Sequence, residues 1–413
     1  MRMNNTYRTI AKPVMILSFL VLLLAASCQR KPLYLASKGN VDLSVAVYDI
    51  RLELLWGVNW EAEWHYSWST SLYGELGYTK PEYVRATFYN TDPVTDIRNN
   101  PQVRNFGATG GRVTLSPGNW YDMLFFNAGT EYILFSQDAS NTFYKASTRS
   151  KSAVSYTKNQ VEGDTIGSYI DMNQPDEFFG TFLDDIHVSE DPSEYEIVEA
   201  EDGSIVYLYK IDATMRPYSF IYLFQVIVLN NEDSLGNRVV GSVGYTVTGL
   251  SRETDLFTRV NSDKTIAITS EDVKPMLDDI TIKMNDTLET KVDVFAARML
   301  TWGLPGINPL AEADKYFGTK GELPARRDCV NPTDSNYVGV GLKLRNGAIF
   351  NVVRNITTEM NNHPAGGVIT IYYDAGKIPD EILNKKNDPS STGGGFNAKV
   401  EDWANTEEAE ITI

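Results

Sequence analysis

Four tryptophans, one at every fourth position, are the residues of this sequence whose spacing most suggests a binding chemistry. Flat indole faces stack on the C–H faces of sugar rings, so such a row could form a platform for a glycan. A spacing of four puts side chains on one face of a helix and equally on one face of a strand. The row can therefore be a ligand platform, part of a core, or a contact with a neighbouring domain. Its members are Trp56, Trp60, Trp64 and Trp68.

Residues for acid–base, nucleophilic or metal chemistry are few. The three histidines are far apart, and no His-x-x-x-His or Cys-x-x-Cys spacing occurs. Asp184-Asp185-x-His187 comes nearest to a ligand cluster, but it lies in an acidic stretch typical of a solvated loop. Cys329 is expected to be inert, and there is no Gly-x-Ser-x-Gly elbow. We expect no cofactor, no metal site and no enzymatic activity, while a carboxylate pair for glycoside hydrolysis stays open.

The N-terminus has the order of features found in bacterial lipoprotein signals. A basic region with Arg2, Arg8 and Lys12 is followed by the apolar run Val14–Ala26, which is shorter than the roughly 20 residues needed to span a bilayer. The run ends Leu24-Ala25-Ala26-Ser27-Cys28, with small residues directly before a cysteine. We therefore predict a signal peptide over residues 1–27 and a lipid on Cys28 that binds a membrane. The alternative is an ordinary cleavable signal.

Charge separates the next segment from the rest of the chain. Residues 28–40 form the predicted tether, which carries Arg30 and Lys31 and an apolar centre, Leu33-Tyr34-Leu35, that can pack on the body. The whole chain has a formal net charge of -17, which argues against nucleic-acid binding because phosphate contacts need a basic face. An acidic body also repels anionic lipid. We therefore expect the lipid on Cys28, and not the body, to attach the protein to the outer membrane. Which face of that membrane it occupies stays open.

Alternating apolar and polar residues recur along most of the chain, separated by frequent turn signals. Val41–Ile50 and Tyr218–Leu229 are predicted strands, and Asn346-Gly347 predicts a hairpin. This pattern predicts an all-β protein with two consecutive β-sandwich domains, at residues 41–204 and 205–413. Asp184–Asp202 is acidic and is the predicted linker between them. Met215-Arg216-Pro217 is predicted to interrupt the strands of the second domain.

The end of the chain could donate a strand to another subunit. Glu410–Ile413 alternates, with Ile411 and Ile413 as the apolar positions, and it has a free terminus. Such a segment can pair with a neighbour's sheet through main-chain hydrogen bonds. It can equally pair within its own domain.

Several segments in order resemble the fimbrillin-like lipoproteins of Bacteroidetes, in particular an uncharacterised group of two-domain lipoproteins. They are the Cys28 region, Val113–Asp122 with its Pro-Gly turn followed by Phe126–Glu131, Met215-Arg216-Pro217 with Val247–Leu250, Asn355–Thr357 with Gly366–Tyr373, and Gly394–Trp403. The resemblance implies two transthyretin-like, Greek-key β-sandwiches and a role in fimbriae or related adhesive structures. It implies no catalytic residue.

Two functions from different classes follow. The first is a lipid-anchored, non-enzymatic, fimbria-like surface component, either an anchor or an adhesive accessory subunit, which contacts other fimbrial subunits by strand addition. The second is a glycan-binding surface lipoprotein that uses the tryptophan row. An extracytoplasmic hydrolase is a more distant third.

Overall fold

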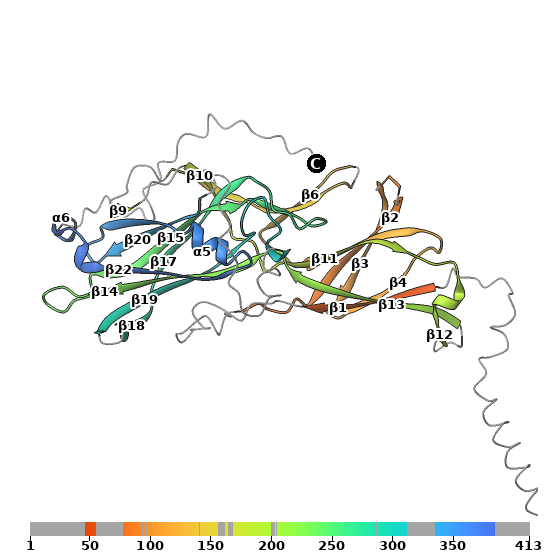
Figure 1. The fold of residues 1–413 in the computed structure, drawn as a ribbon, viewed down its shortest axis with the longest axis horizontal. Coiled ribbons are helices and arrows are strands. Elements are labelled where there is room, and N and C mark those ends of the chain that lie inside the picture. Colours follow the sequence, from red (N-terminus) through yellow and green to blue (C-terminus); the bar gives the residue numbers. More distant parts are fainter. Residues whose placement is uncertain are drawn as a thin grey trace, which may run out of the picture.

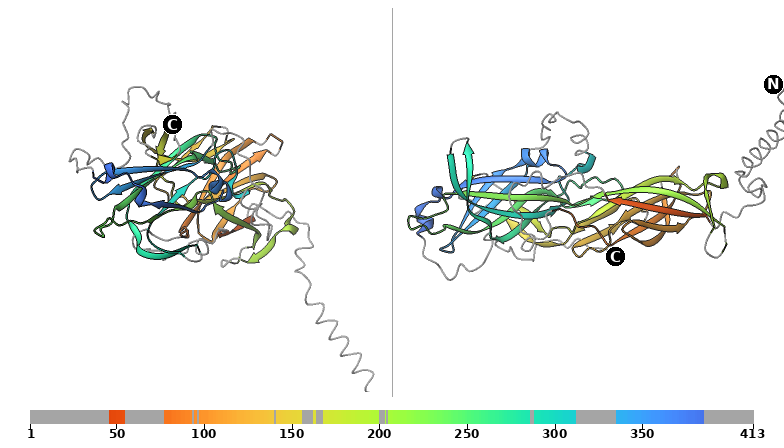
Figure 2. Two further views of the ribbon diagram at one scale, coloured as in Figure 1. Left: turned by 60° about the vertical axis from the view of Figure 1, so that its left-hand side comes forward. Right: turned by 90° about the horizontal axis from the view of Figure 1, so that it is seen from below.

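The structure is a computed structural model that describes residues 46–54, 77–92, 94–95, 97–139, 141–155, 162–163, 168–199, 203, 205–285, 288–311 and 335–384. In these ranges the chain is all-β, as predicted, and its helices are single short turns. The strands form two groups placed end to end along the long axis (Figures 1 and 2). No helix in the described ranges is both long and apolar enough to cross a membrane.

An eight-stranded sheet makes up one group of strands, on the right in Figure 1. In order of pairing its strands are β1 (Ala46–Leu54), β4 (Gly110–Thr114), β3 (Ile97–Gly107), β2 (Tyr83–Asp92), β5 (Trp120–Phe126), β11 (Phe179–His187), β13 (Ile205–Pro217) and β12 (Glu196–Glu199). In addition β1 pairs with β13 in parallel, so the sheet closes on itself. A 3-10 turn, η3 (Pro192–Glu194), leads into β12.

The closed sheet encloses its own core. Successive side chains of a strand point to opposite faces, so every second residue enters the interior. From β1 and β2 these are Tyr48, Ile50, Leu52, Val84, Ala86 and Phe88. The ring of Phe88 meets that of Phe125 edge-on, with centroids 5.9 Å apart. Burial of this apolar surface is what makes closure of the sheet favourable.

Two sheets that face each other form most of the second group. The seven-stranded sheet has the order β8 (Ser150–Ser155), β10 (Ser168–Met172), β17 (Thr265–Val273), β15 (Val240–Ser251), β20 (Tyr337–Leu344), β21 (Ile349–Asn355) and β9 (Glu162–Gly163). The four-stranded sheet has the order β18 (Pro275–Asn285), β19 (Leu288–Thr301), β14 (Phe220–Leu229) and β22 (Gly367–Asp374). One apolar core includes residues of both sheets.

A buried tyrosine ties these two sheets together. Tyr245 projects from β15, donates from its hydroxyl to the carbonyl of Phe295 in β19 at 2.5 Å and accepts from the amide of Val226 in β14 at 3.1 Å. A buried phenol normally has such partners, because an unpaired hydroxyl would destabilise the core. Three short turns complete this group: α5 (Thr357–Asn362), η5 (Ala375–Lys377) and α6 (Asp380–Leu383).

The strand pairing does not follow the sequence order at the middle of the chain. A three-stranded sheet joins β6 (Ile133–Gln137) and β7 (Tyr144–Thr148) to β16 (Glu253–Asp255), and β10 pairs in parallel with β17. Strands that precede residue 205 therefore pair with strands that follow it. Conversely, β13 begins at Ile205 and belongs to the first sheet. The division into domains at residue 205 stays a proposal.

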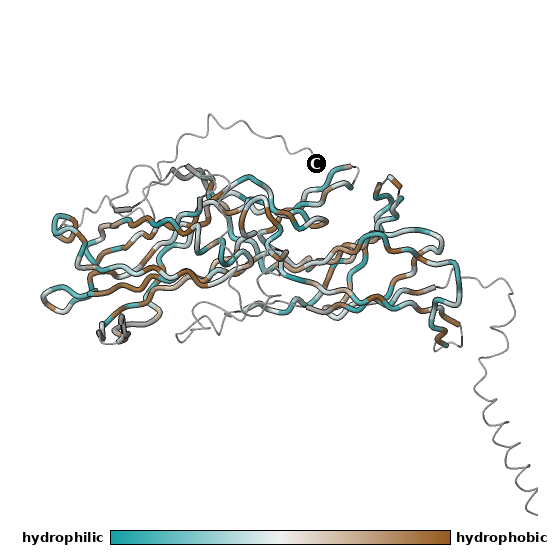
Figure 3. The backbone as a smooth tube through the Cα atoms, in the orientation of Figure 1, coloured by the Kyte–Doolittle hydropathy of each residue, from teal (hydrophilic) through white to brown (hydrophobic). Residues whose placement is uncertain are grey.

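An aromatic cluster joins the two groups of strands. It combines residues of the first sheet with residues of β7, of the segment that leads into β14 and of the segment just after β19, namely Tyr89, Phe126, Tyr144, Phe178, Tyr218 and Trp302. Trp302 is 0% exposed and meets Phe178 edge-on at 6.1 Å. Hydrophobic segments of both groups run toward this region in Figure 3. We call this cluster the aromatic joint.

Two arginines reach across the aromatic joint in opposite directions. Arg98 of β3 forms an ion pair with Asp122 at 2.6 Å, and its guanidinium lies 4.5 Å from the ring centroid of Phe257, in the loop after β16. Arg259, in that same loop, donates to the hydroxyl of Thr181 in β11 at 3.0 Å. Asp122 is 1% exposed, so its charge depends on buried partners, among them Arg98 and the amide of Asp185, which donates to Oδ1 at 3.0 Å.

One prediction about the path of the chain is wrong, and another is displaced by a few residues. Asp184–Asp202 is not a free linker, because it contains the end of β11, η3 and β12, which pairs with β13. The break predicted at Met215-Arg216-Pro217 falls directly after it, since β13 continues through Pro217 and β14 begins at Phe220. Met215 is 0% exposed and belongs to the core of the closed sheet. The proline is tolerated as the last residue of its strand.

A buried carboxylate lies where β10 joins the seven-stranded sheet. Asp171 is 5% exposed; its Oδ2 accepts from the hydroxyl of Thr269 at 2.8 Å, whereas its Oδ1 has no hydrogen-bond partner. Burial raises the pKa of Asp171, and the Thr269 hydrogen bond and the charge of Lys151 oppose that shift only in part. Glu271 adds to the rise in the pKa. The protonated form is thus the one that the fold favours.

Substitution of Arg98 tests the aromatic joint. Arg98→Met leaves the Asp122 charge buried without its ion-pair partner, and we expect a loss of about 3–5 kcal/mol in the free energy of unfolding. Arg98→Met with Asp122→Asn removes the stranded charge and should recover a large part of that loss. Urea denaturation of the three proteins measures both effects. Equal stability of the single and double variants would show that the buried charge of Asp122 is not the cause of the loss.

The pH dependence of stability tests Asp171. Because its folded pKa is raised, its contribution to stability is present in acid and is lost as the pH rises through the folded pKa. Relative to the native chain, Asp171→Asn should therefore gain more stability at pH 7.5 than at pH 4.5. Urea denaturation of both proteins at the two pH values measures this difference. Asp233→Asn is a control of opposite sign, since hydrogen bonds from Asn237 lower the pKa of Asp233. An unchanged pH profile in Asp171→Asn would contradict the assignment.

Candidate strand-exchange site

The candidate functional site is the position that β1 occupies in the closed sheet, between β4 and β13. We call this position the seat of β1. Along its whole length β1 pairs in parallel with β13, from Ala46 opposite Tyr207 to Leu54 opposite Met215. On its other side it pairs antiparallel with β4, from Val47 opposite Thr114 to Arg51 opposite Gly110. Without β1, both neighbours would present unpaired backbone groups and the sheet would be open. Such a gap is a template for a strand from any source.

Side chains of β1 alternate between the core and the surface. Tyr48, Ile50 and Leu52 are 1%, 1% and 8% exposed, so they fill the space inside the closed sheet. The outward residue Asp49 lies 3.6 Å from the guanidinium of Arg112 in β4, an exposed pair that contributes little. Apolar residues at alternate positions are therefore the requirement for any strand in this seat.

Gly110 lets β1 approach the turn between β3 and β4, and Gly111 leaves room for the ring of Phe106. A Cβ on Gly110 would lie 1.8 Å from the carbonyl oxygen of Ile50, and φ of this glycine is +112°. A Cβ on Gly111 would lie 2.5 Å from the ring of Phe106. The amide of Leu52 then donates to the carbonyl of Thr109 at 3.1 Å. Glycine is needed here both for its backbone angle and for the lack of a side chain.

The buried start of β1 is fixed by a pair of tyrosines. The hydroxyl groups of Tyr48 and Tyr195 are 2.8 Å apart, and Tyr195 donates onward to the carbonyl of Ser189 at 2.7 Å. Burial raises the pKa of Tyr48, and the hydrogen bond with Tyr195 adds to that rise. Both phenols therefore stay protonated and serve as neutral hydrogen-bonding groups.

The residues that the sequence singled out for binding lie outside the described residues. This holds for Cys28, for Trp56, Trp60, Trp64 and Trp68, for Ile411 and Ile413, and for Cys329. His187 is described, and its ring lies 4.7 Å from that of Trp120. In the described part of the chain no three His, Cys, Asp or Glu side chains are grouped closely enough to hold a metal ion.

Sequence reasoning identified β1 as a strand but missed its importance. The predicted strand Val41–Ile50 overlaps β1, and its residues 41–45 lie outside the described ranges. The apolar alternation in the sequence favours the face that carries Val47, whereas the structure buries the face with Tyr48 and Ile50. The adjacent glycines Gly110-Gly111 were the available signal for a close backbone approach.

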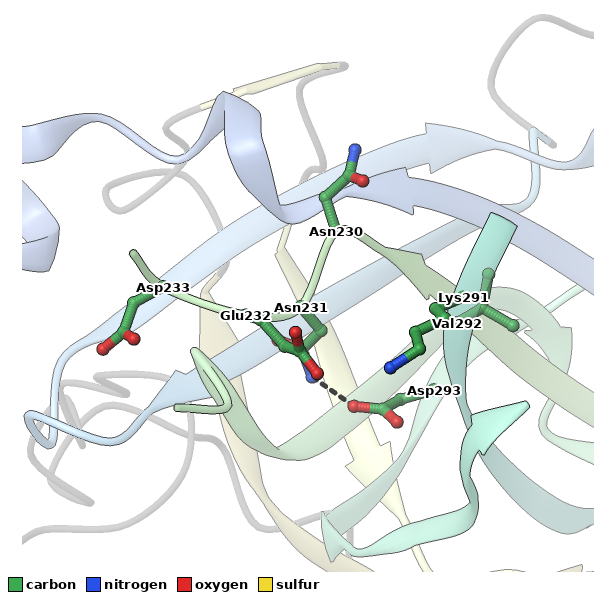
Figure 4. A pocket seen from close by; sticks show the side chains of 7 residues that line it. All are labelled: Asn230, Asn231, Glu232, Asp233, Lys291, Val292 and Asp293. Carbon is green, nitrogen blue, oxygen red and sulfur yellow. Dashed lines mark hydrogen bonds between the residues drawn. The ribbon is translucent and has the colours of Figure 1, made fainter. Parts of the chain in front are cut away.

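A polar pocket of about 340 Å³ opens at the far end of the second group of strands (Figure 4). Its walls are Asn230, Asn231, Glu232, Asp233, Lys291, Val292 and Asp293. The buried carboxylate of Asp293 already accepts from Asn231 at 2.6 Å and from Arg238 at 2.8 Å. These bonds hold the loop after β14 in place and give the pocket a structural explanation.

Comparison with known proteins gives a partial family match and distant structural similarity. Residues 73–220, less than half of the chain, match a family described as "Domain of unknown function (DUF5119)". No curated protein sequence matches the chain. Among solved structures it is similar to a proposed adhesin from Bacteroides ovatus ATCC 8483, with 14% identity over 84% of this chain and 96% of the other, and a TM-score of 0.41.

Two other similar structures are described as fimbrial proteins. One is the fimbrial anchor protein Mfa2 from Porphyromonas gingivalis, with 9% identity, 79% of this chain and 91% of the other covered, and a TM-score of 0.35. The other is a fimbrial assembly protein from Parabacteroides distasonis ATCC 8503, with 8% identity, coverage of 79% and 89%, and a TM-score of 0.25. The predicted resemblance to fimbrillin-like proteins is confirmed to this extent. At such scores the similarity says nothing about function by itself.

Substitution of Gly110 tests the seat of β1. Gly110→Ala places a methyl group against the Ile50 carbonyl and forces a backbone angle that alanine avoids, so we expect destabilisation by about 3 kcal/mol or more. Gly236→Ala is the matched control, because Gly236 also has a positive φ, +75°, but has nothing within 4 Å of its Cβ position. It should cost about 1 kcal/mol. Thermal unfolding measures the loss of stability in both variants, and equal losses would contradict this account.

Proposed function

We propose that the chain is a lipid-anchored, non-enzymatic component of a fimbria-like surface structure, an anchor or an adhesive accessory subunit. In this proposal its body is built as two consecutive transthyretin-like, Greek-key β-sandwiches, Cys28 carries the lipid, and the site of action is the outer membrane. The observation that carries the proposal is the seat of β1. A subunit of a filament needs one strand that can be replaced by a strand from a neighbour, and β1 has the geometry for this.

The pairing of β1 supports this use. The strand supplies three core side chains and pairs on both sides, so an incoming strand of the same pattern would recover the same packing and backbone hydrogen bonds. Exchange of identical elements between copies needs little net free energy, because the incoming strand restores the interactions of the strand that it replaces. The C-terminal residues Ile411 and Ile413 have the alternate apolar spacing that the seat requires.

A disulfide that locks β1 in place tests the proposal. Asp49 and Arg112 are paired residues of β1 and β4 with outward side chains. In a Cys329→Ser background, Asp49→Cys with Arg112→Cys should bind β1 to its own sheet under oxidising conditions. We expect the heat-sensitive ladder of sheared surface filaments to disappear on immunoblots and to return with a reductant. Glu199→Cys with Ile205→Cys, which staples β12 to β13, is the matched control and should leave the ladder intact.

Each result separates two parts of the proposal. A ladder that persists in the locked variant would exclude exchange at β1 and leave the filament role standing. Monomer alone in the native strain, confined to the membrane fraction, would exclude the filament role itself. In a strain with Cys28→Ala, release of the filaments into the medium is expected if the chain is an anchor, and their retention would argue for an accessory subunit.

A further inference from the structure

The end of the closed sheet at which β1 begins carries an aromatic patch. Four tyrosines lie there, with Tyr48 5.4 Å from Tyr209 and Tyr195 6.0 Å from Tyr209 and 6.4 Å from Tyr207, measured between ring centroids. Tyr209 is 39% exposed and Ile205, on the same face of β13, is 41% exposed. The core of the closed sheet thus continues to the surface at this end. We call Tyr207, Tyr209 and Ile205 the tyrosine patch.

Two exposed carboxylates lie beside the tyrosine patch. Glu199 of β12 is directly opposite Ile205, so their side chains share a face of the sheet, and Glu194 of η3 directly precedes the buried Tyr195. Glu194 is close enough to contribute to the raised pKa of Tyr48 and of Tyr195. Lys210 pairs with Glu196 at 2.5 Å on the other face of the sheet, so it leaves both carboxylates beside the patch unneutralised. This end of the sheet is therefore both aromatic and negatively charged.

The segment that precedes β1 has the complementary composition. Residues 29–40 contain Arg30, Lys31 and Lys38, no acidic residue, and the apolar triplet Leu33-Tyr34-Leu35. The segment leads to β1 at Ala46, which is paired with Tyr207 of the patch. The stretch of chain from Leu35 to Ala46 can span up to about 36 Å when extended. The triplet can therefore turn back onto the patch.

We propose that residues 29–40 dock on the tyrosine patch of their own chain. Leu33, Tyr34 and Leu35 cover the exposed rings, and Arg30 and Lys31 lie against the adjacent carboxylates and the faces of the tyrosines. Covalent attachment holds the segment at an effective concentration on the order of millimolar, so even weak contacts suffice for docking. The docked segment fixes the end of the body that faces Cys28. Docking of this segment requires neither strand exchange nor a role in filaments.

Hydrogen–deuterium exchange of the full mature chain with Cys28→Ser tests the docking. We expect amides of residues 32–38 to exchange about tenfold more slowly than in a synthetic peptide of residues 29–40. Glu194→Lys with Glu199→Lys should bring exchange to the rate of the peptide, and adding Arg30→Glu with Lys31→Glu in the same chain should restore protection. Glu232→Lys with Glu381→Lys, in the other group of strands, is the matched control and should change nothing.

Three results would overturn the proposal. One is exchange of residues 32–38 at the rate of the free peptide in the native sequence. Another is slow exchange of residues 32–38 that is unchanged in the charge-reversal variants and persists in 0.5 M salt. At that concentration exposed charges are screened within roughly 4 Å. The third is protection that grows with protein concentration, since this would assign the tyrosine patch to a second copy of the chain. Tyr209→Ser, checked for an unchanged melting temperature, should also speed exchange.

Discussion

The parallel pairing of β1 with β13 is the interaction on which the first half of the molecule depends. All other neighbours in that sheet are antiparallel and closer in sequence than this pair, and they would form an open curved sheet without it. Once β1 is in place, Tyr48, Ile50 and Leu52 complete a core that is otherwise open on one side. The site, the fold and the proposed function thus rest on one strand. A strand that is necessary for closure is also the strand whose replacement would link two molecules.

The aromatic joint packs the two groups of strands against each other. Its rings come from both groups, and Arg98 and Arg259 each extend from one group to the other. Edge-on aromatic contacts and desolvated guanidinium groups have preferred geometries, so they fix an orientation as well as adding stability. The strands β7, β9 and β10 contribute further, because they precede residue 205 and pair with β16, β21 and β17, which follow it.

The all-β class and many single strands could be predicted from the sequence, because period-two alternation and turn residues act locally. The hairpin at Asn346-Gly347 is confirmed between β20 and β21, with Gly347 at a φ of +82°. The strand predicted at Tyr218–Leu229 corresponds to β14. The break predicted at Met215-Arg216-Pro217 falls after Pro217 instead, because a proline at the end of a strand leaves pairing intact. The partners of β1 could not be predicted, since parallel pairing between distant segments leaves no local pattern, and the candidate binding residues lie outside the described ranges.

The distance along the chain between β1 and β13 also has a kinetic meaning. Ala46 pairs with Tyr207, so nearly every other strand of the first sheet is synthesised before β1 meets its parallel partner. Contacts of such high sequence separation form slowly, because loop-closure entropy must be overcome first. During that interval the edges of β1 and β13 that pair in the finished sheet stay open, and the apolar side chains between them stay exposed to water. A newly made chain would therefore pass through an open form, in which a holding chaperone or another copy could pair with either edge before the two strands meet.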